Sequence, residues 1–225
     1  MDTGITDYSL RIRQKFTELF QQDPLLVRAP GRVNLIGEHT DYNMGFVLPA
    51  SINKAIYMGI HKRDDDEIHL HSLDYDDDFQ INVDAIKRSV KLWPDYILGV
   101  VEQIRKTRPD IRGFNLIFGG DIPPGGGLSS SAALECATAY GLNKVYNFRY
   151  EKMELVRMSQ AAENQFVGVK CGIMDQFASI FGRKGHLIRL DCETLEHVYI
   201  PFHAVGIKII LFDTRVKHSL ASSAY

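Results

Sequence analysis

The chain has 225 residues and a formal net charge of −2, with 45% hydrophobic and 24% charged residues. This composition is typical of a soluble globular protein with one large domain, or with one domain and part of another. The charge argues against nucleic-acid binding, and no apolar stretch is long enough to span a bilayer. Three cysteines without CxxC spacing, and an N-terminus without an apolar signal segment, predict a cytoplasmic protein.

Apolar residues recur with helical and with strand-like periods, so the chain is predicted to mix both elements. In the first half, a helical stripe ends at Asp23-Pro24, and a second helix begins at Trp93. Strands are expected there at 45–61, 67–72, 79–83 and 114–118. In the second half, helices are expected at 129–146, at 150–166 and after Gly172, and strands at 186–191, 197–202 and 206–213. Their irregular alternation predicts an α+β fold rather than a doubly wound sheet.

The most informative segment is a glycine-rich turn at 123–134, PPGGGLSSSAAL. Its glycines let the backbone turn tightly and approach a ligand, and its serines stand where a helix begins. The free N–H groups and the dipole of a helix N-terminus favour an anion there. The segment therefore predicts a phosphate cradle, although it is neither a GxxxxGK[ST] loop nor a GxGxxG turn. A glycine-rich loop that only caps a helix is the alternative.

A polar segment at 28–45 gathers Arg32, Glu38, His39 and Asp41 within a few turns. Carboxylates and an imidazole from one loop offer the donors and acceptors that a polyol needs. A solvated loop is the alternative. A metal site is a weaker third interpretation, because no further ligand follows nearby.

A third polar segment, at 163–177, carries two acids in predicted helices. Asp175 falls in the first turn of a helix, where aspartate is also common without a function. Glu163 lies near a helix end, against the preference of the helix dipole, which suggests a role such as binding Mg²⁺. A solvated surface glutamate is the commoner alternative.

Other polar groups are interpreted without a function. The acidic runs at 64–67 and 74–78 are interpreted as solvated turns, and His69 and His71 as surface histidines of one strand.

The three segments together resemble the motifs of one kinase family. Residues 31–45, GRVNLIGEHTDYNMG, resemble the galactokinase signature nearly residue for residue. Residues 125–133, GGGLSSSAA, look like the second motif of the wider family of galactokinase, homoserine kinase, mevalonate kinase and phosphomevalonate kinase. Residues 172–176, GIMDQ, resemble the segment with the catalytic aspartate, and 213–225 the segment with a sugar-binding tyrosine. The resemblance covers nearly the whole chain.

The resemblance implies a fold and a domain division. Residues 1–203 would form an N-terminal kinase domain like the second domain of ribosomal S5, with a left-handed βαβ crossover. Residues 204–225 would begin a second α+β domain. Family members are considerably longer, so we expect this chain to be poorly active by itself. The family usually has glutamate before the tyrosine, where this chain has Ala224.

The resemblance also implies an activity, the transfer of the γ-phosphoryl group of ATP to the C1 hydroxyl of galactose. This reaction is the first committed step of galactose catabolism. Asp175 would accept the hydroxyl proton, kept ionised by its helix-start position and by Arg32, which would also stabilise the transferring charge. The protein would be a monomer that binds neither nucleic acid nor membrane.

The remaining site residues implied by the resemblance fall into three groups. Those expected to bind galactose are Glu38, His39, Asp41, Gly172 and Tyr225. Those expected around ATP are Ser72, Trp93 and Tyr96 at the base, and Gly125, Gly126, Gly127, Leu128, Ser129, Ser130 and Ser131 at the phosphates. Those expected to hold Mg²⁺ are Ser131 and Glu163.

Three other functions stay open at this point. A kinase for a related sugar, such as N-acetylgalactosamine, is disfavoured by the residues at 40–45, since relatives differ there. A non-catalytic regulator that senses galactose and ATP is disfavoured by the complete SSSAA at 129–133, which such relatives shorten. A non-functional fragment is suggested only by the length of the chain.

Overall fold

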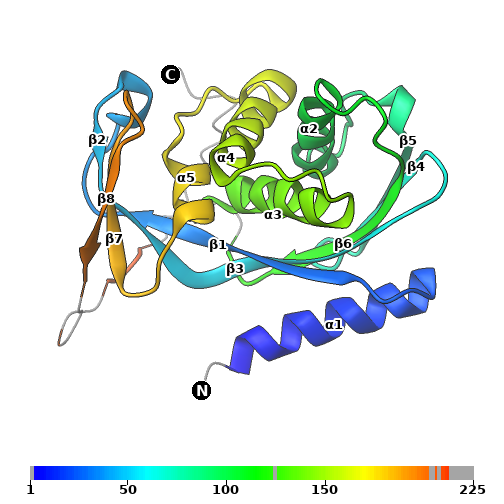
Figure 1. The fold of residues 1–225 in the computed structure, drawn as a ribbon. Coiled ribbons are helices and arrows are strands. Elements are labelled where there is room, and N and C mark those ends of the chain that lie inside the picture. Colours follow the sequence, from blue (N-terminus) through cyan, green and yellow to red (C-terminus); the bar gives the residue numbers. More distant parts are fainter. Residues whose placement is uncertain (1–2, 124–125, 203–205, 207–208, 213–225) are drawn as a thin grey trace.

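The computed structural model describes residues 3–123, 126–202, 206 and 209–212, and Figure 1 shows their arrangement. Two sheets form the framework, a mixed five-stranded sheet in the order β1-β3-β6-β4-β5 and a smaller antiparallel sheet in the order β2-β7-β8. The large sheet consists of β1 (Leu25–Asn34), β3 (Pro49–Lys62), β4 (Glu67–Ser72), β5 (Asp77–Asn82) and β6 (Phe114–Gly120). The small sheet consists of β2 (Phe46–Val47), β7 (His186–Asp191) and β8 (His197–Pro201).

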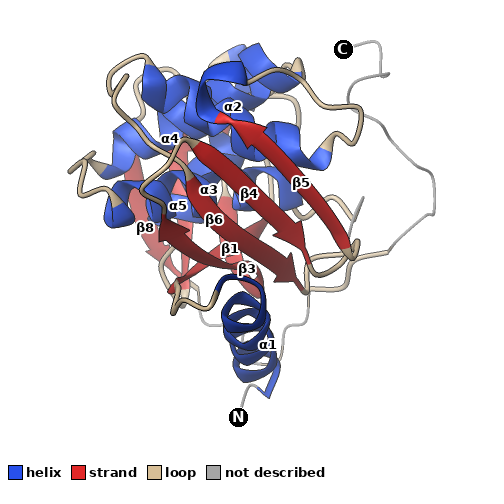
Figure 2. Cartoon of the chain, turned by 90° about the vertical axis from the view of Figure 1, so that its right-hand side faces the viewer, coloured by secondary structure: helices blue, strands red, loops and turns tan. Residues whose placement is uncertain are grey.

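The helices lie unequally on the two faces of the large sheet (Figures 1 and 2). Their bounds are α1 (Thr3–Phe20), α2 (Trp93–Arg105), α3 (Ser130–Val145), α4 (Lys152–Ala161) and α5 (Met174–Phe181). Helix α4 continues into a turn of π-helix, η3 (Ala162–Val167), and short 3₁₀ turns lie at η1 (Asp41–Asn43) and η2 (Val83–Ala85). Helices α2 to α5 cover one face, which we call the inner face, and α1 crosses the outer face.

The inner face holds the main core. Helix α3 is rich in alanine, and Ala133 and Ala137 are fully buried in the same cluster as Met58 and Ile60 of β3. Small side chains let this helix lie close to the sheet, so the start of α3 is held directly over the strands.

The outer face is covered by α1 through a separate cluster. Ile12 and Phe16 are fully buried against Ala55, Tyr57 and Ile117 of the sheet. The helical stripe recognised in the sequence is therefore the face that packs, and the helix ends before Asp23-Pro24 as expected.

The α+β class is confirmed, and the strand at 67–72 has the predicted bounds. Strands β4 and β6 are parallel and are joined through β5 and α2, which is the expected crossover; its left-handed sense stays a prediction. The predicted domain boundary at 203–204 falls where the structure describes the chain only in part, and it also stays a prediction.

Two secondary-structure predictions were wrong. Residues 28–34 were treated as loop, but they belong to β1, where Val27, Ala29, Gly31 and Val33 alternate inward. In the sequence, Pro30 and Gly31 hide this period of two, because both residues are typical of turns. In the structure, they coincide with a register shift between Pro30 and Arg32. Of the strand expected at 206–213, residues 206 and 209–212 are described, and none of these is in a strand.

In the described part of the chain, no helix combines the length and the apolarity needed to cross a membrane.

The outer cluster predicts how α1 contributes to stability. Replacing Phe16, which is fully buried, with alanine should lower the free energy of unfolding by about 3–5 kcal/mol through lost burial and a cavity. Leu10→Ala on the same helix, at a side chain that is 53% exposed, should change it by no more than about 0.5 kcal/mol. Urea unfolding of both variants measures the difference; equal losses would contradict the packing of α1 by this face.

Candidate active site

The centre of the site is an ion pair between segments that are far apart in the sequence. Arg32, on β1, meets Asp175, in the first turn of α5, through two parallel hydrogen bonds. Nε donates to Oδ1 at 2.7 Å and Nη2 donates to Oδ2 at 2.8 Å. Both side chains are largely shielded from solvent. Such a two-pronged pair fixes the direction of both groups as well as their charge.

The glycine-rich loop is tied to this ion pair from the other side. Arg32 Nη1 donates to the carbonyl oxygen of Gly127 at 2.7 Å, and the Ser129 hydroxyl donates to Asp175 Oδ2 at 2.6 Å. Ser129 directly precedes α3 with a φ of 59°, in the left-handed region. Gly31 allows the strand and the loop to approach, because a Cβ there would lie 2.6 Å from the carbonyl oxygen of Leu128. Loop, strand and helix therefore meet at one point.

The polar segment is locked onto α5 by Asp41. Its Oδ1 accepts the backbone N–H of Ile173 at 2.9 Å, and both its oxygens accept that of Met174 at 3.2 Å. Burial raises the pKa of Asp41, and these two N–H groups oppose the shift. A Cβ on Gly172 would lie 2.0 Å from Asp41 Cγ, so the position accepts only glycine. Asp41 and Gly172 are thus brought together, in direct contact.

Glu38 and His39 lie on an exposed turn after β1. The Asn34 amide donates to Glu38, and His39 Nδ1 contacts the hydroxyl of Tyr42. Thr40 closes this turn, since its hydroxyl contacts the carbonyl oxygens of Gly37 at 2.6 Å and Phe46 at 2.7 Å. The turn therefore presents a carboxylate and an imidazole on a braced backbone.

A hollow of about 640 Å³ runs from α2 to the start of α3. Trp93 and Tyr96 line one end of it, and Ser130 and Ser131 line the other. Ser72 is not among its lining residues; it is buried below the adjacent turn, where its hydroxyl accepts the N–H of Tyr75 at 3.4 Å. Four of the ten residues predicted around a nucleotide, two from each group, therefore line one hollow.

The acidic run at 74–78 is largely exposed, as its interpretation as a solvated turn predicts, and its first part borders this hollow. Asp77 accepts the indole N–H of Trp93 at 3.0 Å and an ammonium hydrogen of Lys91 at 2.5 Å. Asp74 is exposed and accepts the N–H of Gly120 at 2.9 Å. The sequence does not show these contacts with Trp93 and Gly120, because they depend on how the turn packs beside α2 and β6.

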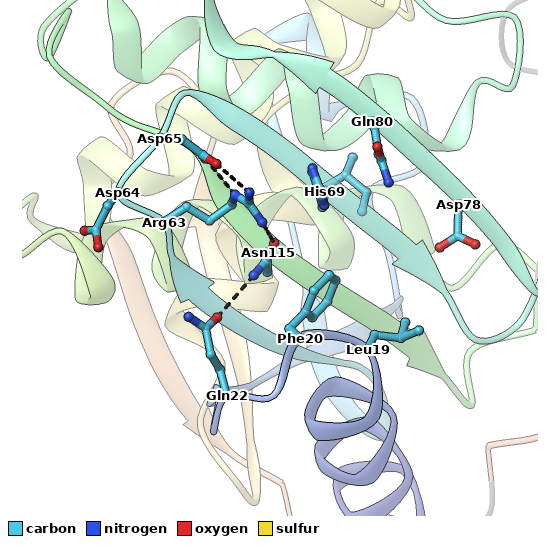
Figure 3. A pocket seen from close by; sticks show the side chains of 11 residues that line it. Leu19, Phe20, Gln22, Arg63, Asp64, Asp65, His69, Asp78, Gln80 and Asn115 are labelled. Atoms are coloured by element: carbon cyan, nitrogen blue, oxygen red, sulfur yellow. Dashed lines mark hydrogen bonds and ion pairs between the residues drawn. The ribbon is translucent and has the colours of Figure 1, made fainter.

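A second hollow, of about 850 Å³, lies on the outer face of the sheet beside the end of α1 (Figure 3). His69, Gln80 and Asn115 project into it from three strands, with Phe20 at its edge. None of its described lining residues belongs to the predicted site. The adjacent His71 is only 4% exposed and its Nδ1 lies 2.9 Å from Asp78 Oδ1, so it is not a surface histidine.

Two buried acids lie behind the start of α3. Glu163, on η3, is 4% exposed, and Glu135, on α3, is fully buried, so the solvated alternative for Glu163 was wrong. Gln176, also fully buried, donates from Nε2 to Glu163 Oε2 at 2.8 Å and to Glu135 Oε2 at 3.2 Å. Sequence reasoning missed Glu135 and Gln176. The one available signal was a glutamate within an otherwise alanine-rich apolar helix.

Burial dominates the electrostatics of these acids. It raises the pKa of Glu163, a hydrogen bond with Ser131 lowers it, and the charge of Asp175 raises it further. Burial and the charge of Glu163 raise the pKa of Glu135 well above its usual range, against a hydrogen bond from Gln176. Among the described residues, neither carboxyl forms an ion pair with a lysine, arginine or histidine.

The donor set fits a small hard cation. The Ser131 hydroxyl and the Glu163 carboxylate are oxygen ligands of the kind that Mg²⁺ prefers, and a cation there would offset the negative charge of Glu163. The described residues contain no group of three or more histidine, cysteine, aspartate or glutamate side chains placed to hold a metal. Mg²⁺ does not require one, since it commonly keeps waters and binds through one or two carboxylates plus phosphate oxygens.

Gly125 and Tyr225, together with Ala224, lie outside the described residues, so the structure does not place them.

Two family models match the chain. The N-terminal domain of GHMP kinases matches residues 95–183, and the galactokinase galactose-binding signature matches residues 14–62. A galactokinase of Thermotoga petrophila is 45% identical over 199 residues, covering 88% of this chain and 55% of the relative. A galactokinase of Roseiflexus sp. is 40% identical over 226 residues, covering 100% of this chain and 56% of the relative. The chain thus spans about half the length of the curated relatives it matches.

Solved structures agree with these matches. Lactococcus lactis galactokinase complexed with galactose superposes with a TM-score of 0.82 at 36% identity, covering 88% of this chain and 52% of that one. Methanococcus jannaschii mevalonate kinase shares the fold, with a TM-score of 0.67 at 21% identity, covering 80% of this chain and 56% of that one.

This chain belongs to the GHMP kinase family. Its fold, its glycine-rich loop before α3 and the matched domain all agree with that membership. Within that family it carries the galactokinase galactose-binding signature, and the two curated relatives named above are galactokinases. The family resemblance seen in the sequence is confirmed.

The buried acids predict a pH-dependent stability. Folding raises the pKa of Glu135 above the usual glutamate value of 4.5, so the folded state holds the proton more tightly than the unfolded state does. The resulting stabilisation is complete below 4.5 and is lost as the pH rises through the folded pKa. Without divalent cations, we expect the urea midpoint to fall from about pH 5 to about pH 8.

The variant Glu135→Gln should flatten this fall, because it removes the titrating group and keeps its volume. Glu102→Gln, at an exposed position on α2, is the matched control and should leave the pH dependence unchanged. An identical slope in Glu135→Gln and in the wild type would contradict the assignment.

Proposed function

We propose that the full-length protein is a galactokinase, which transfers the γ-phosphoryl group of ATP to the C1 hydroxyl of galactose and forms galactose 1-phosphate and ADP. The observation that carries this proposal is the Arg32–Asp175 pair, held between the galactose-binding signature and the glycine-rich loop. The names of the curated relatives, and a galactokinase structure with galactose, support the choice of sugar.

Asp175 is the proposed proton acceptor. Its carboxylate receives hydrogen bonds from Arg32 and Ser129, which fix its direction. A modest base is sufficient, because in a loose phosphoryl-transfer transition state positioning and charge neutralisation supply most of the rate. Arg32 is positioned to serve both purposes: it orients Asp175 and brings positive charge beside the loop at Gly127.

Galactose is proposed to bind against the signature segment. Glu38 and His39 offer an acceptor and a second polar group on an exposed, braced turn. Asp41 and Gly172 shape the pocket from beside Asp175, through the contacts that join the segment to α5. Tyr225 is proposed to complete the pocket from outside the described residues.

ATP is proposed to occupy the hollow between α2 and α3. Its base would lie near Trp93 and Tyr96, above the turn that begins at Ser72, and its phosphates would reach the start of α3. The residues proposed at the phosphates are Gly125, Gly126, Gly127, Leu128, Ser129, Ser130 and Ser131. The N–H groups and the dipole of a 16-residue helix favour the phosphate charge at this end.

Ser131 and Glu163 are proposed to hold Mg²⁺. The ion, when bound, would neutralise charge on the phosphate oxygens. Glu163 approaches Ser131 from the π-helical turn, and its burial keeps water away from the carboxylate. Residues 204–225 are proposed to begin the second domain, and the protein is proposed to act as a monomer.

An assay of the full-length protein tests the activity directly. Galactose with Mg²⁺ and ATP should give stoichiometric ADP and a galactose phosphate that is acid-labile at C1, whereas N-acetylgalactosamine should give at least about tenfold less at equal concentration. Binding of galactose and ATP without any phosphorylated sugar would instead identify a regulator.

Removing the proposed base should affect turnover more than binding. Asp175→Asn should reduce kcat by at least about a hundredfold, with a much smaller rise in the KM for galactose. Asp110→Asn, at an exposed position, is the matched control and should behave as wild type. Near-normal turnover of Asp175→Asn would remove Asp175 from the mechanism.

A further inference from the structure

We propose that Gln176 is a positioning residue for the metal site: its amide holds the Glu163 carboxylate in the direction that presents it, beside Ser131, to a divalent cation. This inference rests on the proposed function, because it assigns a role to the residue next to the proposed base. It concerns a side chain that touches none of the proposed substrates.

The NH2 group of the Gln176 side chain donates hydrogen bonds to both acids. Nε2 carries two hydrogens, and it lies 2.8 Å from Glu163 Oε2 and 3.2 Å from Glu135 Oε2. The Glu163 carboxylate also decides which way the amide faces, because the opposite orientation would point the amide carbonyl oxygen at a group that only accepts hydrogen bonds. Glu163 Oε2 is therefore held in place, and this fixes the direction of the other carboxylate oxygen.

The arrangement is costly unless it serves a purpose. Gln176 and Glu135 are fully buried, and within the described structure Gln176 Oε1 and Glu135 Oε1 have no hydrogen-bond partner. Unsatisfied polar atoms in a core are destabilising, and apolar side chains of similar volume would fill the same space without that cost. The presence of these buried polar residues is therefore explained better by a need to orient Glu163 than by a contribution to the stability of the fold.

The surroundings make Gln176 a rigid support. Asn164 follows Glu163 on η3, and it accepts the N–H of Cys171 at 2.7 Å and donates to the Cys171 carbonyl oxygen at 3.2 Å. These bonds join η3 to the loop that leads into α5. Gln176 adds a buried hydrogen bond from α5 to Glu163 on η3. The proposed base, Asp175, and the residue that orients the proposed metal ligand, Gln176, are therefore neighbours in one helix.

The role predicts a specific loss. A carboxylate that is free to turn should bind the cation less tightly, while a nucleotide without metal should bind as before. Removal of a residue that orients a metal ligand commonly reduces metal affinity by about 10- to 100-fold. We expect a loss of that size in the metal-dependent part of nucleotide binding.

The experiment is calorimetric titration of the full-length protein with ADP, in EDTA and in excess Mg²⁺ or Mn²⁺. The variants are Gln176→Met, which removes the amide, and Gln176→Asn, which keeps the amide but shortens its reach by one methylene. The matched control is Gln165→Met on the same π-helical turn, at an exposed position. Thermal unfolding of each variant reports whether the fold is retained, and if Gln176→Met does not fold, Gln176→Asn carries the test.

The quantity compared is the ratio of the ADP affinity in excess metal to the ADP affinity in EDTA. We expect this ratio to fall by at least about tenfold in both Gln176 variants and to stay unchanged in Gln165→Met. Metal-free ADP affinity should stay within about twofold of wild type. An unchanged strengthening by metal in folded Gln176→Asn would overturn the positioning role, and so would equal losses with and without metal, which indicate a structural role. Wild-type protein that binds ADP without any effect of metal would overturn it as well. Wild-type protein that shows neither nucleotide binding nor galactose-dependent ADP formation would overturn the proposed function itself.

Discussion

The two-pronged ion pair between Arg32 and Asp175 is the interaction on which the arrangement of the site depends. It joins the C-terminal end of β1 to the first turn of α5. Through hydrogen bonds with Gly127 and Ser129, the pair also fixes the glycine-rich loop. Removing one member of a shielded pair leaves the other charge without its partner, which is far more costly than the pair itself is stabilising. Three segments of the chain are therefore positioned by one contact, and a substrate would find them already in place.

Close backbone approach is the second constraint, and glycine supplies it at two points. At Gly31 the strand passes within contact distance of the Leu128 carbonyl oxygen, and at Gly172 the chain passes directly over the Asp41 carboxylate. Side chains at these positions would push the signature segment away from the loop or from α5. The glycines therefore explain how polar motifs from different parts of the chain share one small volume.

Acidic side chains gather behind this volume. Glu135, Glu163 and Asp175 influence one another, and the described residues provide Arg32 as the cation that pairs with Asp175. The start of α3 adds the positive end of a helix dipole. Such a site suits a ligand that brings its own charges of both signs, and a metal-bound nucleotide is one. The hollow on the outer face of the sheet, in contrast, is lined largely by polar side chains and holds none of the predicted site residues (Figure 3).

The sequence by itself determined the class of fold, most element positions and the chemical identity of the motifs, because these depend on local periodicity and on short runs of residues. It named Arg32, Asp175 and the loop serines, and it joined them into one site only through the family resemblance. Only the tertiary structure showed the hydrogen bonds through which they meet, the bond from Trp93 to Asp77, and the burial of Glu163. It also revealed Gln176 and Glu135, of which only Glu135 carries a local signal, as a glutamate in an otherwise alanine-rich apolar helix. The physical reason is that hydrogen bonds and burial depend on which surfaces pack together, and residues 143 positions apart in the chain, such as Arg32 and Asp175, are brought into contact only by the complete fold.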